Sequence, residues 1–109
     1  MKKVNSFPVS ISRPPLRPKD IVDIALVCAS LSDPVRISLL DLVARAGLNG
    51  ICACDLVAPL HRSQPTISHH LKVLRQAGVV SVRREGTWLW YTMSPAAFHR
   101  VKNYLGSIS

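Results

Sequence analysis

The segment Ser63-Gln64-Pro65-Thr66-Ile67-Ser68-His69-His70-Leu71 decides the fold of this chain. Ser63 is a preferred N-cap residue and Pro65 stands in the turn that follows it, so a helix begins here. Apolar residues recur at positions i, i+4 and i+7 of this helix: Ile67, Leu71 and Leu74. Gly78 occupies the C′ position, where a residue with positive φ ends many helices. The pattern predicts a capped amphipathic helix with one buried stripe and one polar, exposed face.

Three helices are predicted upstream of this segment. Residues 21–31 carry apolar side chains at helical spacing, and the stripe includes Cys28. Asp33-Pro34 combines an N-cap with proline at the first helical position, and the helix that begins there ends at Gly47. A short third helix runs from about Asp55 to Leu60.

A β-hairpin and a last helix are predicted downstream. Residues 80–84 alternate between apolar and polar, Glu85-Gly86 turns the chain, and residues 87–93 alternate again. Ser94-Pro95 caps the last helix, whose apolar residues form one stripe: Phe98, Val101 and Leu105.

This order of elements is typical of a winged helix-turn-helix, which is mainly α with a β-hairpin wing and here has five helices. The terminal helices, Ile21–Leu31 and Pro95–Leu105, carry apolar stripes that have no obvious place in so small a core. We expect them to form the interface of a homodimer. A two-fold dimer of this kind places its two recognition helices one DNA turn apart.

Composition indicates one domain with an anionic partner. A length of 109 residues fits a single domain, and an apolar content of 48% excludes a disordered chain. The net charge of +8 predicts binding to nucleic acid, although such an excess can also serve solubility alone. Glu85 is the one acid beyond Leu56, so the basic surface belongs to the half of the chain that contains the capped helix.

The first nineteen residues differ in composition from the rest. Residues 1–19 contain four prolines and five basic side chains but no acid, which predicts a flexible arm along DNA or over a partner subunit; an inert tail is the alternative. Residues 20–109 then form the DNA-binding and dimerisation domain. No apolar run is long enough to span a bilayer, and no apolar stretch follows Met1-Lys2-Lys3, so we expect a cytoplasmic protein with reduced thiols.

The polar face of the capped helix is the predicted DNA contact surface. Exposed residues early in a recognition helix enter the major groove, and here they are Ser63, Gln64, Thr66, Ser68 and His69. Gln64 can pair with adenine through two hydrogen bonds. Lys72 and Arg75 are placed for phosphates, whereas His70 can instead pack against the domain.

The hairpin extends this surface. Arg83 and Arg84 approach its tip and are expected to meet the DNA backbone or the minor groove. Trp88, Trp90 and Tyr91 are interpreted as core and wing-packing residues, with base stacking in a single-strand binder as the alternative.

Cys52 and Cys54 form a candidate ligand site. Residues i and i+2 point about 200° apart in a helix, so the two thiols converge only if the pair straddles a helix start. A helix N-terminus and nearby basic groups would lower the thiol pKa and favour thiolate. Thiolates select soft ions over magnesium or calcium. Two buried apolar cysteines are the alternative.

Several runs together resemble the ArsR/SmtB metalloregulators over residues 21 to 105. They are Leu31–Arg36, Cys52–Leu56, Ser63–Leu74, Gly78 and Gly86–Tyr91. The resemblance implies a homodimeric winged-helix repressor that leaves its operator when a metal or metalloid binds. The Cys-x-Cys-Asp-Leu version is similar to the arsenic and cadmium/lead branches of the family.

Within that resemblance, the expected inducer is As(III) or Sb(III). Trivalent arsenic and antimony prefer three sulfurs, so Cys28 or solvent would complete the shell begun by Cys52 and Cys54. Otherwise Cys28 is a small core residue.

Other functions remain open at this point. The same repressor could respond to cadmium, lead or zinc, or to a disulfide or persulfide formed at the thiols. A thiol redox protein is disfavoured because the motif is Cys-x-Cys and no βαβ pattern surrounds it. A structural or RNA-binding module is a further alternative. No set of nucleophile, base and orienting residue is recognisable, which predicts a protein that is not an enzyme.

Overall fold

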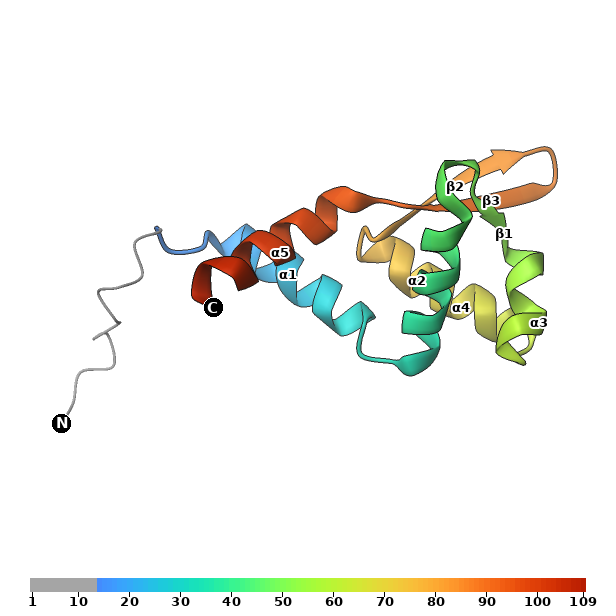
Figure 1. Ribbon diagram of the computed structural model, residues 1–109, viewed down its shortest axis with the longest axis horizontal. Coiled ribbons are helices and arrows are strands. Elements are labelled where there is room, and N and C mark those ends of the chain that lie inside the picture. The colour runs from blue at the N-terminus through green and yellow to red at the C-terminus, as the bar shows by residue number, and fades with distance from the viewer. Residues whose placement is uncertain (1–13) are drawn as a thin grey trace.

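Five α-helices and a small antiparallel sheet make up the part of the chain, residues 14–109, that this computed structural model describes (Figure 1). The helices are α1 (Pro18–Ser30), α2 (Pro34–Ala46), α3 (Val57–Leu60), α4 (Gln64–Gln76) and α5 (Pro95–Ile108). The strands are β1 (Ile51–Cys52), β2 (Val80–Glu85) and β3 (Trp88–Met93), and 3-10 turns cover Gly47–Asn49 and Ala53–Leu56. The winged helix-turn-helix with five helices is confirmed. The expected arm lies largely outside the described residues, and α1 begins at Pro18, inside its expected range.

The helix starts and stops follow local side-chain chemistry. The Asp33 carboxylate accepts a hydrogen bond from the Val35 amide at 2.7 Å, and Ser63 accepts one from the Thr66 amide at 3.4 Å. Gly47 and Gly78 both have positive φ, +71° and +81°, at the ends of α2 and α4. These signals confirm the predicted boundaries.

Ser94 is the N-cap residue of α5, and this helix begins at Pro95 as predicted. Its side chain makes no capping hydrogen bond to α5. The backbone N–H of Ser94 donates instead to the Val79 carbonyl at 3.0 Å, so the residue still belongs to the end of the hairpin.

The core lies where α2 and α4 pack against the sheet. The three apolar residues of α4, Ile67, Leu71 and Leu74, are completely buried as predicted. They meet Leu39 and Val43 of α2. This packing holds α4 by one face and leaves its other face free.

The sheet has the strand order β1-β3-β2 and is antiparallel throughout. Sequence reasoning missed β1, which is only two residues long. It also placed the turn one residue early: Glu85 pairs with Trp88, so the connecting residues are Gly86 and Thr87. Gly86 has φ +64° and Thr87 has no positive φ, as a type II′ hairpin requires.

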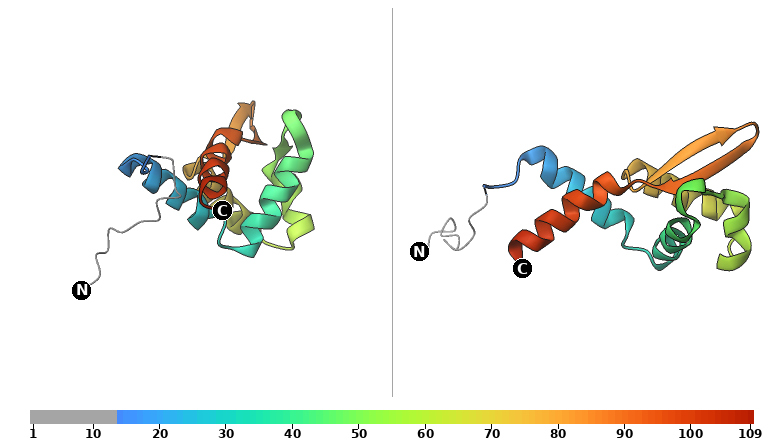
Figure 2. Two further views of the ribbon diagram at one scale, coloured as in Figure 1. Left: turned by 60° about the vertical axis from the view of Figure 1, so that its left-hand side comes forward. Right: turned by 45° about the horizontal axis from the view of Figure 1, so that its top comes forward.

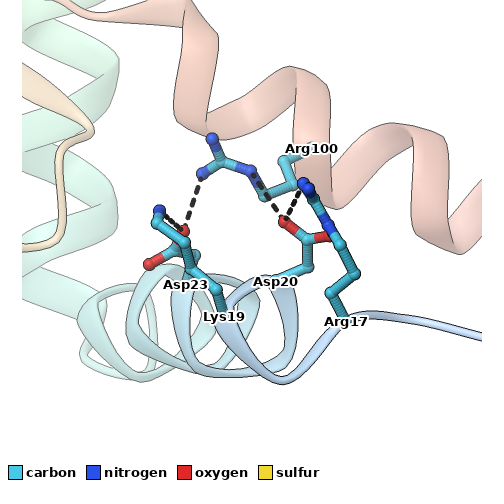
Figure 3. Close-up of polar contacts among 5 residues, drawn as sticks. All are labelled: Arg17, Lys19, Asp20, Asp23 and Arg100. Carbon is cyan, nitrogen blue, oxygen red and sulfur yellow. Dashed lines mark hydrogen bonds and ion pairs between the residues drawn. The ribbon is translucent and has the colours of Figure 1, made fainter.

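The terminal helices α1 and α5 pack together at the end of the molecule opposite the hairpin (Figures 1 and 2). Ion pairs join them, as Figure 3 shows: Arg100 of α5 lies 3.9 Å from Asp20 and 3.5 Å from Asp23 of α1. Arg17 and Lys19 bind the same two carboxylates at 3.0 and 2.9 Å. The hydrogen bond from Arg17 lowers the pKa of Asp20, so this carboxylate stays charged. Among the described helices, none has the length and apolar character needed to cross a membrane.

Candidate nucleic-acid interface and thiol pair

The free face of α4 carries the predicted DNA contacts. Most of them are exposed to solvent: Ser63, Gln64, Ser68, His69, Lys72 and Arg75. Thr66 is half-buried, and its hydroxyl lies 2.9 Å from the Ser63 hydroxyl. The side chains predicted to contact a DNA groove thus lie on a helix whose opposite face is packed in the core.

His70 belongs to the scaffold of this face. Arg36 of α2 donates to its Nδ1 at 3.1 Å, and the same guanidinium donates to the Ser30 carbonyl at 2.7 Å. Burial lowers the pKa of His70, with the Arg36 charge acting in the same direction. The ring therefore stays neutral at pH 7 and ties α4 to α2, a link that sequence reasoning did not assign to Arg36.

The hairpin arginines have different environments. Arg83 donates from Nε to the Glu85 carboxylate at 3.3 Å and from Nη2 to the Asn49 carbonyl at 3.3 Å. Arg84, next along β2, is exposed. Both side chains are exposed, but protein groups engage that of Arg83, so Arg84 is the better placed of the two for a DNA phosphate.

The aromatic residues of β3 also differ. Tyr91 is buried in the core and Trp90 is half-buried, as expected for packing residues. Trp88 is 55% exposed at the hairpin tip, so its predicted packing role is wrong. The turn begins two residues before Trp88, and no element of the core reaches that far.

Cys52 and Cys54 converge at the start of a 3-10 turn. Cys52 is buried, pairs with Trp90 in the β1–β3 ladder, and caps the turn: its Sγ accepts from the Cys54 amide at 3.4 Å. Cys54 is exposed. The pair straddles a turn start as predicted, with one sulfur inside and one at the surface.

The expected effect on the thiol pKa is wrong for Cys54. The hydrogen bond with Cys52 raises the pKa of Cys54, and desolvation and the negative Asp55 raise it further. Adjacent sulfur and carboxylate groups outweigh the field of a single 3-10 turn.

Cys28 lies apart from this pair. It is exposed on α1, because Ile24, Val27 and Ser30 are the residues of α1 that turn into the protein. Its expected place in the core is wrong. Within residues 14–109 of one chain, no three His, Cys, Asp or Glu side chains gather to hold a metal.

Comparison with known proteins establishes the family. The family model described as "Bacterial regulatory protein, arsR family" matches residues 33–82. The chain is 34% identical to an arsenical resistance operon repressor of Staphylococcus aureus over 87 residues, 80% of this chain and 81% of the relative. This chain belongs to the ArsR family. It is also 43% identical over 67 residues to an uncharacterized HTH-type transcriptional regulator of Methanocaldococcus jannaschii, covering 62% of this chain and 73% of that protein.

A solved structure supports the same assignment. The ArsR-like transcriptional regulator from Rhodococcus sp. RHA1 matches with a TM-score of 0.73 and 28% identity, over 83% of this chain and 82% of that one. The chain is thus an ArsR-family DNA-binding transcriptional repressor, and its relatives are regulators rather than enzymes. The matched residues 33–82 include both the thiol pair and α4.

Proposed function

We propose that this chain is a homodimeric repressor that leaves operator DNA when trivalent arsenic or antimony binds Cys52 and Cys54. The observation that carries the proposal is the cysteine pair at the start of the 3-10 turn, where Cys52 Sγ accepts from the Cys54 amide and the surrounding segment packs against both β3 and α4. The arsenical resistance repressor among its relatives supports the same inducer.

The donor set fits a soft, thiophilic ligand. Two cysteines lie one residue apart at one turn, and the exposed Cys54 is the thiol that an incoming ligand meets before the buried Cys52. The described residues supply no third sulfur nearby, so solvent completes the shell in this proposal. Arsenous acid exchanges hydroxide for thiolate and releases water, which carries off the thiol protons, so the raised pKa of Cys54 does not prevent binding.

Two routes connect the thiols to the DNA contacts. The first runs through the sheet: Cys52 pairs with Trp90 of β3, and Arg83 of β2 donates to Asn49, three residues before Cys52. The second runs along the chain from the 3-10 turn through α3 into α4. A ligand that draws the two sulfurs together would displace both the sheet contacts and the segment leading to α4. The free energy of ligand binding is therefore coupled to the free energy of DNA binding.

The dimer contact is proposed at α1 and α5. Five apolar side chains of this helix pair are about half exposed: Ile21, Val22, Leu26, Leu105 and Ile108. Apolar surface that a single chain leaves uncovered in this way is available to a second copy. A two-fold axis here leaves both α4 helices and both wings outward. The substitution Val22→Asp should shift the sedimentation of the protein from dimer to monomer.

The experiment is fluorescence anisotropy of the reduced protein on labelled DNA from its own promoter. We expect arsenite and antimonite to release the wild-type protein and Cys28→Ser, but not Cys52→Ser or Cys54→Ser. Cadmium, lead and zinc are titrated in parallel. Dependence on Cys28 would make that thiol the third ligand. DNA binding that is unaffected by arsenite, but is lost when another ion or an oxidant acts on the same two thiols, would show that the inducer is different. The assignment as a repressor would then still stand.

A further inference from the structure

Trp90 has a buried hydrogen-bond donor that the fold leaves without a partner. The residue is half-buried at the surface of the sheet, yet its Nε1 atom is buried. Among the buried side-chain nitrogen and oxygen atoms of residues 14–109, this one alone makes no hydrogen bond. Buried polar groups in proteins are nearly always paired, so the orphaned N–H indicates an acceptor that comes from outside the chain.

The strand pairing places Trp90 beside the thiol pair. Trp90 lies directly opposite Cys52 in the β1–β3 ladder, so the two side chains share one face of the sheet, with Cβ atoms about 4.5–5.5 Å apart. The next pair, Ile51 and Tyr91, joins the core on the other face. A Cβ at Gly50 would lie 3.5 Å from the Cβ of Trp90, which shows how closely β1 approaches this residue. The buried thiol and the orphaned donor are therefore neighbours on the outer face of the sheet.

Arg83 completes a row of side chains on this face. It pairs with Trp90 in the β2–β3 ladder, so Cys52, Trp90 and Arg83 follow one another across the three strands. The Arg83 guanidinium reaches across β3 to the Asn49 carbonyl at 3.3 Å, and in doing so spans the strand that carries Trp90. The neighbours of Cys52 along this row are hydrogen-bond donors. They suit a ligand that carries an oxygen as well as an atom that binds sulfur.

Inorganic arsenic bound by two thiols is a ligand of this kind. Arsenous acid, As(OH)3, reacts with two thiols to give (RS)2As–OH and two waters. Two As–S bonds form and two As–O bonds break, each thiol proton leaves with a hydroxide, and the oxidation state stays +3. Within residues 14–109 of one chain, no third Cys, His, Asp or Glu completes a ligand group, so the third position keeps its hydroxyl. That oxygen is an acceptor for an N–H.

We propose that Trp90 is a specificity-determining residue of the thiol site, whose Nε1–H donates to the hydroxyl oxygen of an inorganic arsenic or antimony held by Cys52 and Cys54. The inference deepens the proposed function and rests on it. Methylarsonous acid, CH3As(OH)2, also binds two thiols with loss of two waters, but a methyl group then stands where arsenite has its hydroxyl. It offers no acceptor to Trp90. The donor therefore favours the inorganic inducer over an organic one of nearly the same size.

Calorimetric titration of the reduced protein with arsenite and with methylarsonous acid tests this specificity. Trp90→Phe should weaken arsenite binding about three- to tenfold, as expected for the loss of one hydrogen bond, and should leave the affinity for methylarsonous acid unchanged. The imidazole of Trp90→His keeps an N–H at the corresponding ring position, so this variant should restore the preference for arsenite. Equal weakening of both ligands by Trp90→Phe would mean that the ring acts only by packing, and would overturn the proposal.

A second measurement leaves Trp90 in place. In the 15N-labelled protein the two tryptophans give two indole N–H signals, and Trp88→Phe identifies the one that belongs to Trp90. We expect arsenite to move the Trp90 N–H proton downfield, as hydrogen bonding does, and methylarsonous acid to leave it near its free position. If both ligands bind and move this signal alike, only this inference fails. If the wild type binds neither ligand, the proposed function fails with it.

Discussion

Gly50 is a position where the absence of a side chain matters both for the fold and for the thiol site. It precedes β1 with φ +82° and ψ 177°. A Cβ at this residue would lie 3.0 Å from the Tyr91 carbonyl oxygen and 3.1 Å from the Thr92 methyl. The substitution Gly50→Ala therefore pushes β1, and Cys52 with it, away from β3.

Gly47 provides the matched control. Its backbone, at φ +71° and ψ −155°, lies in the same region that only glycine adopts freely, yet a Cβ there meets nothing within 4 Å. The backbone strain should cost about 1–3 kcal/mol in either alanine variant. Overpacking against β3 adds about 1–3 kcal/mol for Gly50→Ala alone. We expect losses of about 1–3 kcal/mol at Gly47 and about 2–6 kcal/mol at Gly50.

Equilibrium unfolding in urea, followed by circular dichroism, measures both losses under the same conditions. The informative quantity is the difference between the two variants, because the strain of the backbone cancels in it. Equal losses would refute the reasoning, since they would mean that β1 moves away from β3 at no cost. A changed slope with urea would show instead that one variant alters the unfolded state or breaks two-state behaviour.

Two further predictions concern titration. Burial lowers the pKa of His70 from its ordinary value of 6.5, so the folded state disfavours its charged form. The free energy of unfolding should fall as the pH drops from about 6.5 through the lowered pKa, and this fall should be weaker in His70→Gln; identical pH profiles would contradict the assigned environment. The Cys52 side chain raises the pKa of Cys54, so Cys52→Ala should speed alkylation of Cys54 by iodoacetamide near pH 7. Mass spectrometry separates this site from Cys28, and an unchanged rate at Cys54 would contradict the effect of Cys52 on its pKa.

Local patterns in the sequence predicted the helices well. The caps at Asp33 and Ser63 and the glycine after α4 act within a few residues of where they stand. The buried stripe of α4 follows from helical spacing alone. These features identified the winged helix and the exposed face of α4 without knowledge of tertiary contacts.

The remaining features depend on residues far apart in the sequence. Two residues are too few to show alternation, and β1 exists because Gly50 allows close approach to Tyr91, some forty positions later. α1 carries apolar residues on more than one face, so spacing could not show that Cys28 points outward. The effect of Cys52 on the Cys54 pKa required knowing that the two side chains meet.

The same dependence gives Arg83 a structural role in addition to the DNA contact that was predicted. It was predicted as a DNA contact, yet its guanidinium binds the Asn49 carbonyl and the Glu85 carboxylate. Both arginines are exposed, but a guanidinium held on two sides is less available to a phosphate than that of Arg84. Arg83 also joins the wing to the loop that leads into the thiol pair. Because β1 also pairs with β3, a displacement of Cys52 would move the wing through two contacts, the β1–β3 pairing and the Arg83–Asn49 hydrogen bond. We infer that the wing, as well as α4, belongs to the element that an inducer at the thiols would move.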